Sequence, residues 1–322
     1  MRVAFVLVLG TLAALVVPAT AGAHVRSART AVDYRADVST APPGITARVY
    51  PADLALGLTV APGHRAVVLG YVGEPAIRVG DSGVEVNQSS PTAAGTGLVK
   101  RQAGPAAGAP RWELISSRPR IVWHDARVRG NPPGVTRRHW TVPLLVDGRQ
   151  GSIAGELVRV PRPSVLPWLV LGALSVVVTF VLARRRSLLR TATTVPGLVA
   201  GAATVATAAD FAFASSANEG AWVEGANELV FVLVGLVFVI WGSTDTRALA
   251  GGALGLLALA VGLSKLPVLL HGIVLSALPG QLSRTAVAVA ICAGGAAVVL
   301  GVFVFFDVLE HHEEPAELQA RL

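Results

Sequence analysis

The chain has 322 residues, a net charge of +7, a hydrophobic content of 52% and a mean hydropathy of +0.59. An ordinary soluble protein is less apolar, and the apolar residues concentrate in the second half, so the composition predicts a membrane protein whose first half faces water. Residues 24–163 hold eighteen Lys and Arg against ten Asp and Glu, a surplus that favours anionic partners over cationic ones.

The first 23 residues have the pattern of a secretory signal peptide. A positive charge at Arg2 precedes an apolar run over residues 3–17, which a proline and several small residues follow. Cleavage after residue 23 makes His24 the first residue, and its free amine and imidazole then offer a metal two nitrogens. A competing cleavage site after Ala21 leaves a glycine first and removes this feature.

Residues 24–163 are predicted to form an extracytoplasmic β-sandwich, either immunoglobulin-like or cupredoxin-like. Between residues 45 and 160, apolar and polar residues alternate with period two, which predicts about seven short strands in two sheets. The turns Asp81-Ser82-Gly83 and Asp147-Gly148 are typical of hairpins, because glycine accepts a positive φ. Residues 93–110 are rich in Ala, Gly and Pro and predict a flexible loop inside the domain.

The second half is predicted to be a five-helix transmembrane bundle, which makes the whole an α+β membrane protein. After a proline-rich junction, five apolar runs have about the length that crosses a hydrocarbon core of ~30 Å. The runs are 165–183, 195–214, 226–241, 248–270 and 285–306. Residues 164–306 are thus the membrane domain and 307–322 a tail. Lys265 and Pro267 predict that the fourth run kinks or ends early, with residues 268–278 as a short interfacial piece.

The arginines predict the orientation in the plasma membrane. Arg184 to Arg186 and Arg190 directly follow the first run, and short loops rich in arginine stay in the cytoplasm. The sandwich then lies outside and the C-terminus in the cytoplasm, as export of the first half also requires. Arg284 is the one cation beside a span that this rule does not explain.

Ionisable residues of the second half collect near one end of the predicted spans. Asp210, Glu228, Lys265 and His271 all fall on the outer side in this topology, and charges at membrane depth are usually paired or functional. We expect a polar cluster that faces the sandwich, with Asp210 and Lys265 as an ion pair. A structural salt bridge is favoured over an ion or substrate pathway, because the inner halves of the runs are apolar or small.

Copper is the metal that the N-terminus suggests. A histidine brace holds Cu(II) with the amine and ring of a terminal histidine and a second imidazole. His24 is the candidate first ligand and His124 the second, with Asp125 as an oxygen ligand or as the group that orients an imidazole. His64 and His139 are expected to be surface residues. The alternative is an N-terminus that begins with histidine by chance.

Three segments resemble a largely uncharacterised family of actinobacterial exported membrane proteins. They are VVLGYVGEP at 67–75, GVEVNQSSP at 83–91 and WHD at 123–125. The resemblance covers most of the chain and implies a signal peptide, a β-rich outer domain and a multi-span C-terminal half. In architecture this family is similar to copper-resistance proteins in which an exported β-sandwich that begins with histidine accompanies a membrane bundle.

The chain departs from the family pattern at two positions. The pattern continues His-Asp-His-Arg, but Ala126 stands at the second histidine, so a ligand that this histidine supplied elsewhere is missing here. Ala76 follows the Glu-Pro pair where an aromatic residue is usual, which leaves that loop less anchored.

The same motifs also have a purely structural interpretation. Glycines on either side of Tyr71 permit a bulge or tight turn, and Trp123 and Trp140 are large enough to fill a sandwich core. Glu74 and Asp125 are then expected to pair with the arginines of the domain.

These features predict a non-catalytic protein that binds a partner or ligand at the outer surface, with copper handling as a narrower form. Nucleotide-binding, serine-hydrolase and zinc-protease motifs are absent from the sequence, and Cys292, the single cysteine, lies in an apolar run. One alternative is an assembly module whose basic face contacts a membrane protein or an anionic envelope polymer. Another is a transporter component. Membrane lipid is an expected contact, and export excludes nucleic acid.

Overall fold

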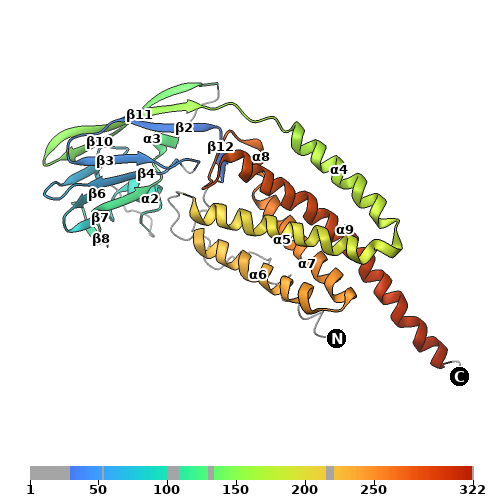
Figure 1. Ribbon diagram of the computed structural model, residues 1–322. Coiled ribbons are helices and arrows are strands. Elements are labelled where there is room, and N and C mark those ends of the chain that lie inside the picture. Colours follow the sequence, from blue (N-terminus) through green and yellow to red (C-terminus); the bar gives the residue numbers. More distant parts are fainter. Residues whose placement is uncertain (1–29, 53, 100–108, 130–133, 215–220, 321–322) are drawn as a thin grey trace.

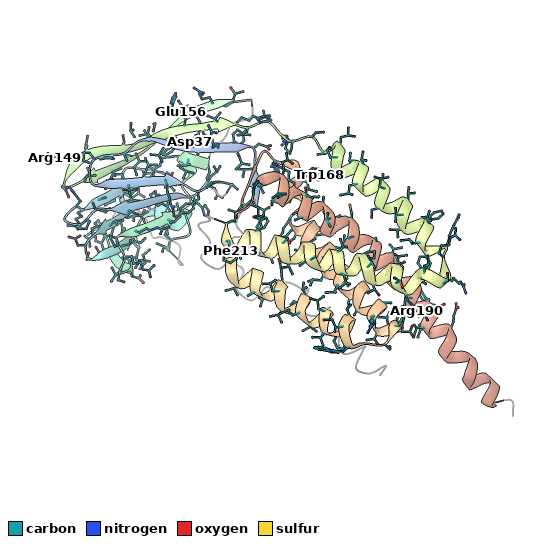
Figure 2. All side chains as sticks on the ribbon, viewed as in Figure 1. Asp37, Arg149, Glu156, Trp168, Arg190 and Phe213 are labelled. Carbon is teal, nitrogen blue, oxygen red and sulfur yellow. The ribbon has the colours of Figure 1, made fainter. Side chains whose placement is uncertain are left out.

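The computed structural model describes residues 30–52, 54–99, 109–129, 134–214 and 221–320. Figure 1 shows two parts that follow each other along the chain, a β-rich region and a helical region. The sandwich lies at one end of the helices. In Figure 2, Arg190 marks the opposite end of the helical region and Arg149 the far end of the β-rich region.

The β-rich region consists of two antiparallel sheets. The larger sheet contains, in this order, β2 (Tyr34–Thr40), β11 (Arg149–Arg159), β10 (Arg137–Val146), β5 (Ala66–Leu69), β6 (Pro75–Gly80), β7 (Gly83–Asn87) and β8 (Trp112–Ser116). The smaller sheet contains β3 (Ile45–Val49), β4 (Leu56–Val60) and β9 (Arg120–Trp123). The predicted β-rich region is confirmed, but these ten strands exceed the expected seven. The edge strand β2 has one fully buried residue in seven, so its apolar periodicity is weak.

One hydrophobic core joins the two sheets. Leu56 and Leu58 of the smaller sheet are buried in the same cluster as Leu144 of the larger one. Trp123 and Trp140 are each only 3% exposed, as the structural interpretation of the motifs predicts. The inward faces of both sheets therefore form a sandwich core of large side chains.

Both predicted hairpins are present. Gly80 pairs with Gly83, so Asp81 and Ser82 form a two-residue turn and Gly83 already belongs to β7. Between β10 and β11, Asp147 and Gly148 have φ values of 50° and 79°. Positive φ at both turn positions matches the right-handed twist of the strands that they join.

The predicted flexible loop begins as ordered structure, which corrects that expectation for its first residues. Helix α2 (Pro91–Gly95) starts at the N-cap Ser90, whose hydroxyl accepts from the backbone N–H of Ala93. Ala93 and Val99 are buried against the sandwich. The buried side chains of Ala93 and Val99 dock this segment on the sandwich, and the composition of the segment does not show that they are buried. Residues 100–108 of the predicted loop lie outside the described residues.

Within the described residues, the helical region contains five long helices and two short ones. They are α4 (Leu166–Ala183), η1 (Arg186–Leu188), α5 (Leu189–Phe213), α6 (Ala221–Trp241), α7 (Thr244–Ser264), α8 (Pro267–Leu270) and α9 (Gly280–Ala320). Within the described residues, four segments are long and apolar enough to cross a membrane: α4, η1 with α5, α7, and α9 up to Glu310. The apolar part of α6, Gly225–Trp241, is shorter. Four candidate spans are thus found where five were predicted.

The ends of the helices depart from the predicted apolar runs. Helix α5 begins six residues before the predicted run, and the Thr193 hydroxyl donates to the carbonyl of Leu189 at 2.8 Å. The fourth run does end early, since α7 stops at Ser264 and Pro267 opens α8. Helix α9 continues through the predicted tail to Ala320.

Candidate functional site

The sandwich is fastened to the helical region by paired backbone. Strand β1 (Ala31–Val32) forms an antiparallel pair with β12 (Ile273–Val274), which lies in the loop between α8 and α9 (Figure 1). The N–H of Leu275 also donates to the carbonyl of Thr30 at 2.8 Å. Leu275 is buried within the sandwich core, against which Phe211 of α5 packs. We call this contact region between sandwich and helices the junction.

A buried carboxylate, Asp33, lies at the centre of the junction. Its Oδ2 accepts from Nε of Arg162 at 2.6 Å, and its Oδ1 accepts from the N–H of Gly272 at 3.2 Å. The same Oδ1 lies 3.0 Å from Nδ1 of His271 in a hydrogen bond. Burial acts to raise the pKa of Asp33, but the hydrogen bonds from Arg162, His271 and Gly272 outweigh it and hold the pKa below its usual value. The charge therefore joins three segments of the chain.

Arg284 supports the same loop from α9, which explains the cation that the orientation rule left over. Its Nη2 donates to the carbonyls of His271 and Gly272 at 2.9 and 3.0 Å, and its Nε donates to the carbonyl of Val268 at 3.2 Å. The side chain is buried and satisfies carbonyls at the C-terminal end of α8. It is thus a structural contact of the junction.

The expected ion pair between Asp210 and Lys265 is wrong, because each side chain has another partner. Oδ1 of Asp210 accepts from the hydroxyl of Ser276 at 2.7 Å and from the N–H groups of Ala277 and Leu278 at 2.8 and 2.9 Å. Nζ of Lys265 donates to both carboxylate oxygens of Glu228 at 3.1 and 3.0 Å. Asp210 lies in the last turn of α5 and contacts the loop before α9, whereas Lys265 follows α7 and contacts α6. The loop contacts decide the pairing, and sequence position does not reveal them.

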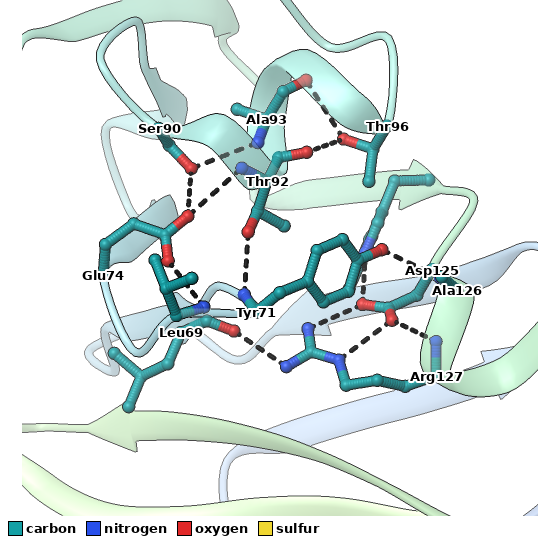
Figure 3. A network of polar contacts seen from close by, with 12 residues as sticks. Leu69, Tyr71, Glu74, Ser90, Thr92, Ala93, Thr96, Asp125, Ala126 and Arg127 are labelled. Atoms are coloured by element: carbon teal, nitrogen blue, oxygen red, sulfur yellow. Dashed lines mark hydrogen bonds and ion pairs between the residues drawn. The ribbon is translucent and has the colours of Figure 1, made fainter. Parts of the chain in front are cut away.

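The three family-like segments meet in one polar network, which Figure 3 shows. Asp125 is fully buried at its centre. Its Oδ1 accepts from the backbone N–H and Nε of Arg127, both at 2.9 Å. Its Oδ2 accepts from Nη2 of Arg127 at 2.7 Å and from Nε1 of Trp123 at 3.1 Å. The expected pairing of Asp125 with an arginine is present, and four hydrogen bonds occupy its carboxylate.

Tyr71 links this carboxylate to the other two segments. Its hydroxyl accepts from the N–H of Ala126 at 2.9 Å, and its backbone N–H donates to Oγ1 of Thr92 at 2.7 Å. The Arg127 guanidinium lies 5.0 Å from the centre of the Tyr71 ring and donates to the carbonyl of Leu69 at 3.0 Å. The bulge beside Leu69 and the positive φ of Gly73 confirm the predicted distortion of the chain here.

Glu74 completes the network without an arginine, contrary to the expectation. Its Oε1 accepts from the hydroxyl of Ser90 at 2.7 Å and the N–H of Thr92 at 3.2 Å, and its Oε2 accepts from the N–H of Val72 at 3.2 Å. Burial acts to raise the pKa of Glu74, but the hydrogen bonds from Thr92 and Ser90 outweigh it and lower the pKa. The network therefore holds two loops and α2 together.

The predicted copper site is not tested by the described residues. His24 lies outside the described residues, and the described part of the chain contains no group of three or more His, Cys, Asp or Glu side chains that could hold a metal. His64 and His139 have exposed side chains that contact Asp147 and Glu156, respectively. Copper binding through His24 and His124 stays a prediction.

Sequence reasoning missed the residues at the heart of the junction. Asp33 and Arg162 flank the strands of the sandwich, and Gly272 lies in the loop between α8 and α9; no motif connects them. A side chain on Gly272 would come within 2.7 Å of the Pro161 carbonyl oxygen, so only glycine fits this approach. Two sequence signals pointed to this loop: the unexplained Arg284, and His271, which was predicted in the polar cluster and contacts Asp33.

These contacts define a class of protein: a helical protein with candidate membrane spans and an antiparallel β-sandwich fastened to one end. Comparison of the chain with known protein families, with curated proteins and with solved structures finds no match. Its function therefore has to be inferred from the chemistry of its own residues.

Proposed function

We propose that this chain is a non-catalytic plasma-membrane protein that binds a partner or ligand at the outer surface. In this proposal residues 1–23 are a signal peptide, α6 is a fifth span, the sandwich is extracytoplasmic and the C-terminus is cytoplasmic. The orientation is supported by the separation of the sandwich from Arg190, which lie at opposite ends of the helices (Figure 2).

The observation that carries the proposal is the junction. A domain that only captured a diffusing ligand would need no more than a flexible tether. Here a strand pair, a buried carboxylate with three hydrogen-bond donors and a shared apolar contact fix the sandwich on the helices. Fixed orientation relative to the membrane matters for a partner that is itself held there, such as another membrane protein or an envelope polymer.

Gentle extraction tests the proposal. The tagged full-length chain is purified from its native membrane at low salt, and a co-purifying protein or polymer is expected. His271→Ala weakens the junction while Asp33 keeps Arg162, and we expect it to reduce co-purification. Asp37→Ala, which removes an exposed ion pair with Arg35, is the matched control and should leave co-purification unchanged. Recovery of the chain without any bound protein or polymer contradicts the proposal. A partner that dissociates at high salt indicates binding through the basic face of the sandwich.

The family resemblance and the finer fold belong to this proposal. We infer that the motif segments of the actinobacterial family preserve the network around Asp125 and Glu74, since all three segments contribute to it. The sandwich is then an immunoglobulin-like or cupredoxin-like domain. The network gives Tyr71, Glu74 and Asp125 structural roles, so these three motif residues do not by themselves support copper chemistry.

Copper handling remains a narrower proposal that rests on His24. It predicts that the mature protein binds one Cu(II) with a nitrogen-rich spectroscopic signature, and that an extra residue placed before His24 abolishes the binding. Asp125→Asn should leave Cu(II) affinity unchanged if the carboxylate only holds Arg127. Equal binding with and without the extra residue contradicts the brace.

A transporter component is the least supported alternative. The ion pairs of the bundle's described residues lie near its two ends: Glu228 and Lys265 on the sandwich side, and Arg190 with Asp245 and Asp307 on the other. Ion or substrate flux in vesicles that contain only this chain is the observation that would favour it.

A further inference from the structure

A polar cleft lies at the end of the sandwich farthest from the helices. Its volume is about 460 Å³, and six of its lining residues have polar side chains. These are His64, Arg65, Arg78, Asp81, Ser82 and Glu85. The position follows from Asp147, which contacts His64 and lies two residues before Arg149, the residue at the sandwich tip in Figure 2. We call this feature the distal cleft.

Two of its side chains are held by neighbours that leave part of their hydrogen-bonding capacity unused. Nδ1 of His64 lies 2.7 Å from Oδ2 of Asp147, whose Oδ1 accepts from the N–H of Arg65 at 2.9 Å. Nε2 of His64 is not used in this pair. The oxygens of Asp81 accept from the N–H of Gly63 at 3.1 and 3.2 Å and keep further lone pairs.

Arg78 is fixed more firmly. It forms two hydrogen bonds with the Glu85 carboxylate, and its guanidinium stacks 4.4 Å from the centre of the Trp112 ring. The hydrogen bond from Arg78 lowers the pKa of Glu85, so this pair stays ionised at neutral pH. Because Glu85 and Trp112 hold the planar Arg78 guanidinium, the side chain loses little conformational entropy when a ligand binds.

The charges of the cleft balance, and this restricts the ligand. Arg65, Arg78, Asp81 and Glu85 all line the cleft, and Arg78 and Glu85 are paired with each other. An anion would meet the two carboxylates, and a cation would meet the two guanidinium groups. An apolar ligand would leave fixed donors and acceptors unpaired. Neutral hydroxyl groups both donate and accept, so they match this lining.

We propose that the distal cleft binds a neutral sugar unit of an envelope glycan. The guanidinium of Arg65 and the hydroxyl of Ser82, which line the cleft, supply donors, while Asp81 supplies acceptors. The inference rests on the proposed function in one respect, that the sandwich faces the outside of the cell. Its place at the tip presents the cleft away from the membrane.

Titration of neutral oligosaccharides into the purified full-length protein tests this site. Arg65→Gln shortens the side chain and removes the guanidinium donors, and Asp81→Asn replaces one carboxylate acceptor by a donor at unchanged size, so each should weaken the best ligand about tenfold. Arg137→Gln is the matched control, because Arg137 is an exposed arginine at the opposite end of β10. It should leave the dissociation constant unchanged.

Three outcomes overturn the proposal: no neutral sugar binds at millimolar concentration, the two cleft variants bind like the control, or only polyanions bind, with steep salt dependence. The extraction experiment separates this failure from failure of the proposed function. A partner that still co-purifies with Arg65→Gln and Asp81→Asn would preserve the general function and remove only the glycan site.

Discussion

The sandwich and the helical bundle fill their cores with different side chains. The sandwich buries large residues, among them Leu56, Leu58 and Trp140. The bundle brings helix backbones together at glycines: a Cβ on Gly197 would lie 2.4 Å from the carbonyl oxygen of Gly251, and one on Gly294 would lie 2.7 Å from that of Gly255. The sandwich thus packs through large apolar side chains, whereas the bundle packs through close backbone contacts at glycines.

The difference follows from the solvent, water or lipid, that each apolar side chain leaves when it is buried. In water, burial of apolar surface stabilises the fold by about 25 cal/mol per Å². Among lipid tails that gain disappears, and helices associate through close van der Waals contact, which small residues allow. Helices α5, α7 and α9 meet through such residues. Helix α4 buries only Thr179 and contacts α9 through Trp168 and Leu171 and through the hydrogen bond from Ser175 to the carbonyl of Cys292.

The largest expected effect tests the comparison with one substitution in both cores. Leu58 in β4 and Leu300 in α9 are both 0% exposed. Leu58→Ala should cost about 2–5 kcal/mol of the free energy of unfolding. Leu300→Ala should cost less, because the unfolded bundle keeps this side chain in lipid. Hydrogen exchange in lipid discs measures both. Equal losses would mean that the two cores share one source of stability.

Two neighbouring glycines sharpen the same contrast inside the bundle. A Cβ on Gly294 would meet backbone atoms of Gly255 and Leu259 at 2.7 and 2.8 Å, whereas one on Gly295 meets nothing within 4 Å. Gly294→Ala should therefore destabilise the bundle by about 1–3 kcal/mol. Gly295→Ala should be neutral or slightly stabilising, because alanine favours helix. Thermal unfolding in detergent compares the two, and similar melting temperatures would contradict backbone packing there.

The junction tests whether the two regions behave as one body. Asp33→Ala leaves Arg162, His271 and the N–H of Gly272 without their acceptor, so local opening of β1 from β12 should become easier by about 1–2 kcal/mol. Hydrogen exchange at β1 and β12 should speed up while exchange in β4 stays unchanged. Asp37→Ala serves as control. Uniform exchange changes would indicate unfolding of the whole sandwich instead.

The smallest expected effect concerns acid stability of the sandwich. The pKa of Glu74 is lowered from its usual value of 4.5 in the folded state. The unfolded chain therefore takes up the proton first, and the contribution of Glu74, complete at neutral pH, is lost as the pH falls below about 4.5. Glu74→Gln should flatten this dependence without removing it, since Asp33 also has a lowered pKa. Denaturant unfolding between pH 7 and pH 3 measures both slopes.

Much of the fold was predictable because its signals are local. The turn at Asp147-Gly148 needs positive φ, and the break at Lys265 and Pro267 needs a residue that cannot continue a helix. Helix α2 was missed because its stability comes from two buried contacts, those of Ala93 and Val99. The turn and the helix break were predictable because glycine and proline have strong backbone preferences that act on neighbouring residues.

The candidate site was less predictable, because its partners are distant in the chain. Asp33 and His271 are 238 residues apart, and Lys265 lies 37 residues from Glu228. Choosing Asp210 as the partner of Lys265 rested on their shared side of the membrane, which leaves several acidic residues equivalent. The path of the loop before α9 brings Ser276 to Asp210, so Asp210 accepts from Ser276 and Lys265 pairs with Glu228.

By itself, the sequence determined that the chain has a water-exposed β-rich half and an apolar helical half, because period-two alternation and membrane-length runs are properties of neighbouring residues. Tertiary structure alone decided the strand order, the glycine contacts between helices, and the junction that Asp33 holds. Each of these depends on which distant segments come into contact. A buried carboxylate or a glycine without Cβ affects stability only where such a contact buries it.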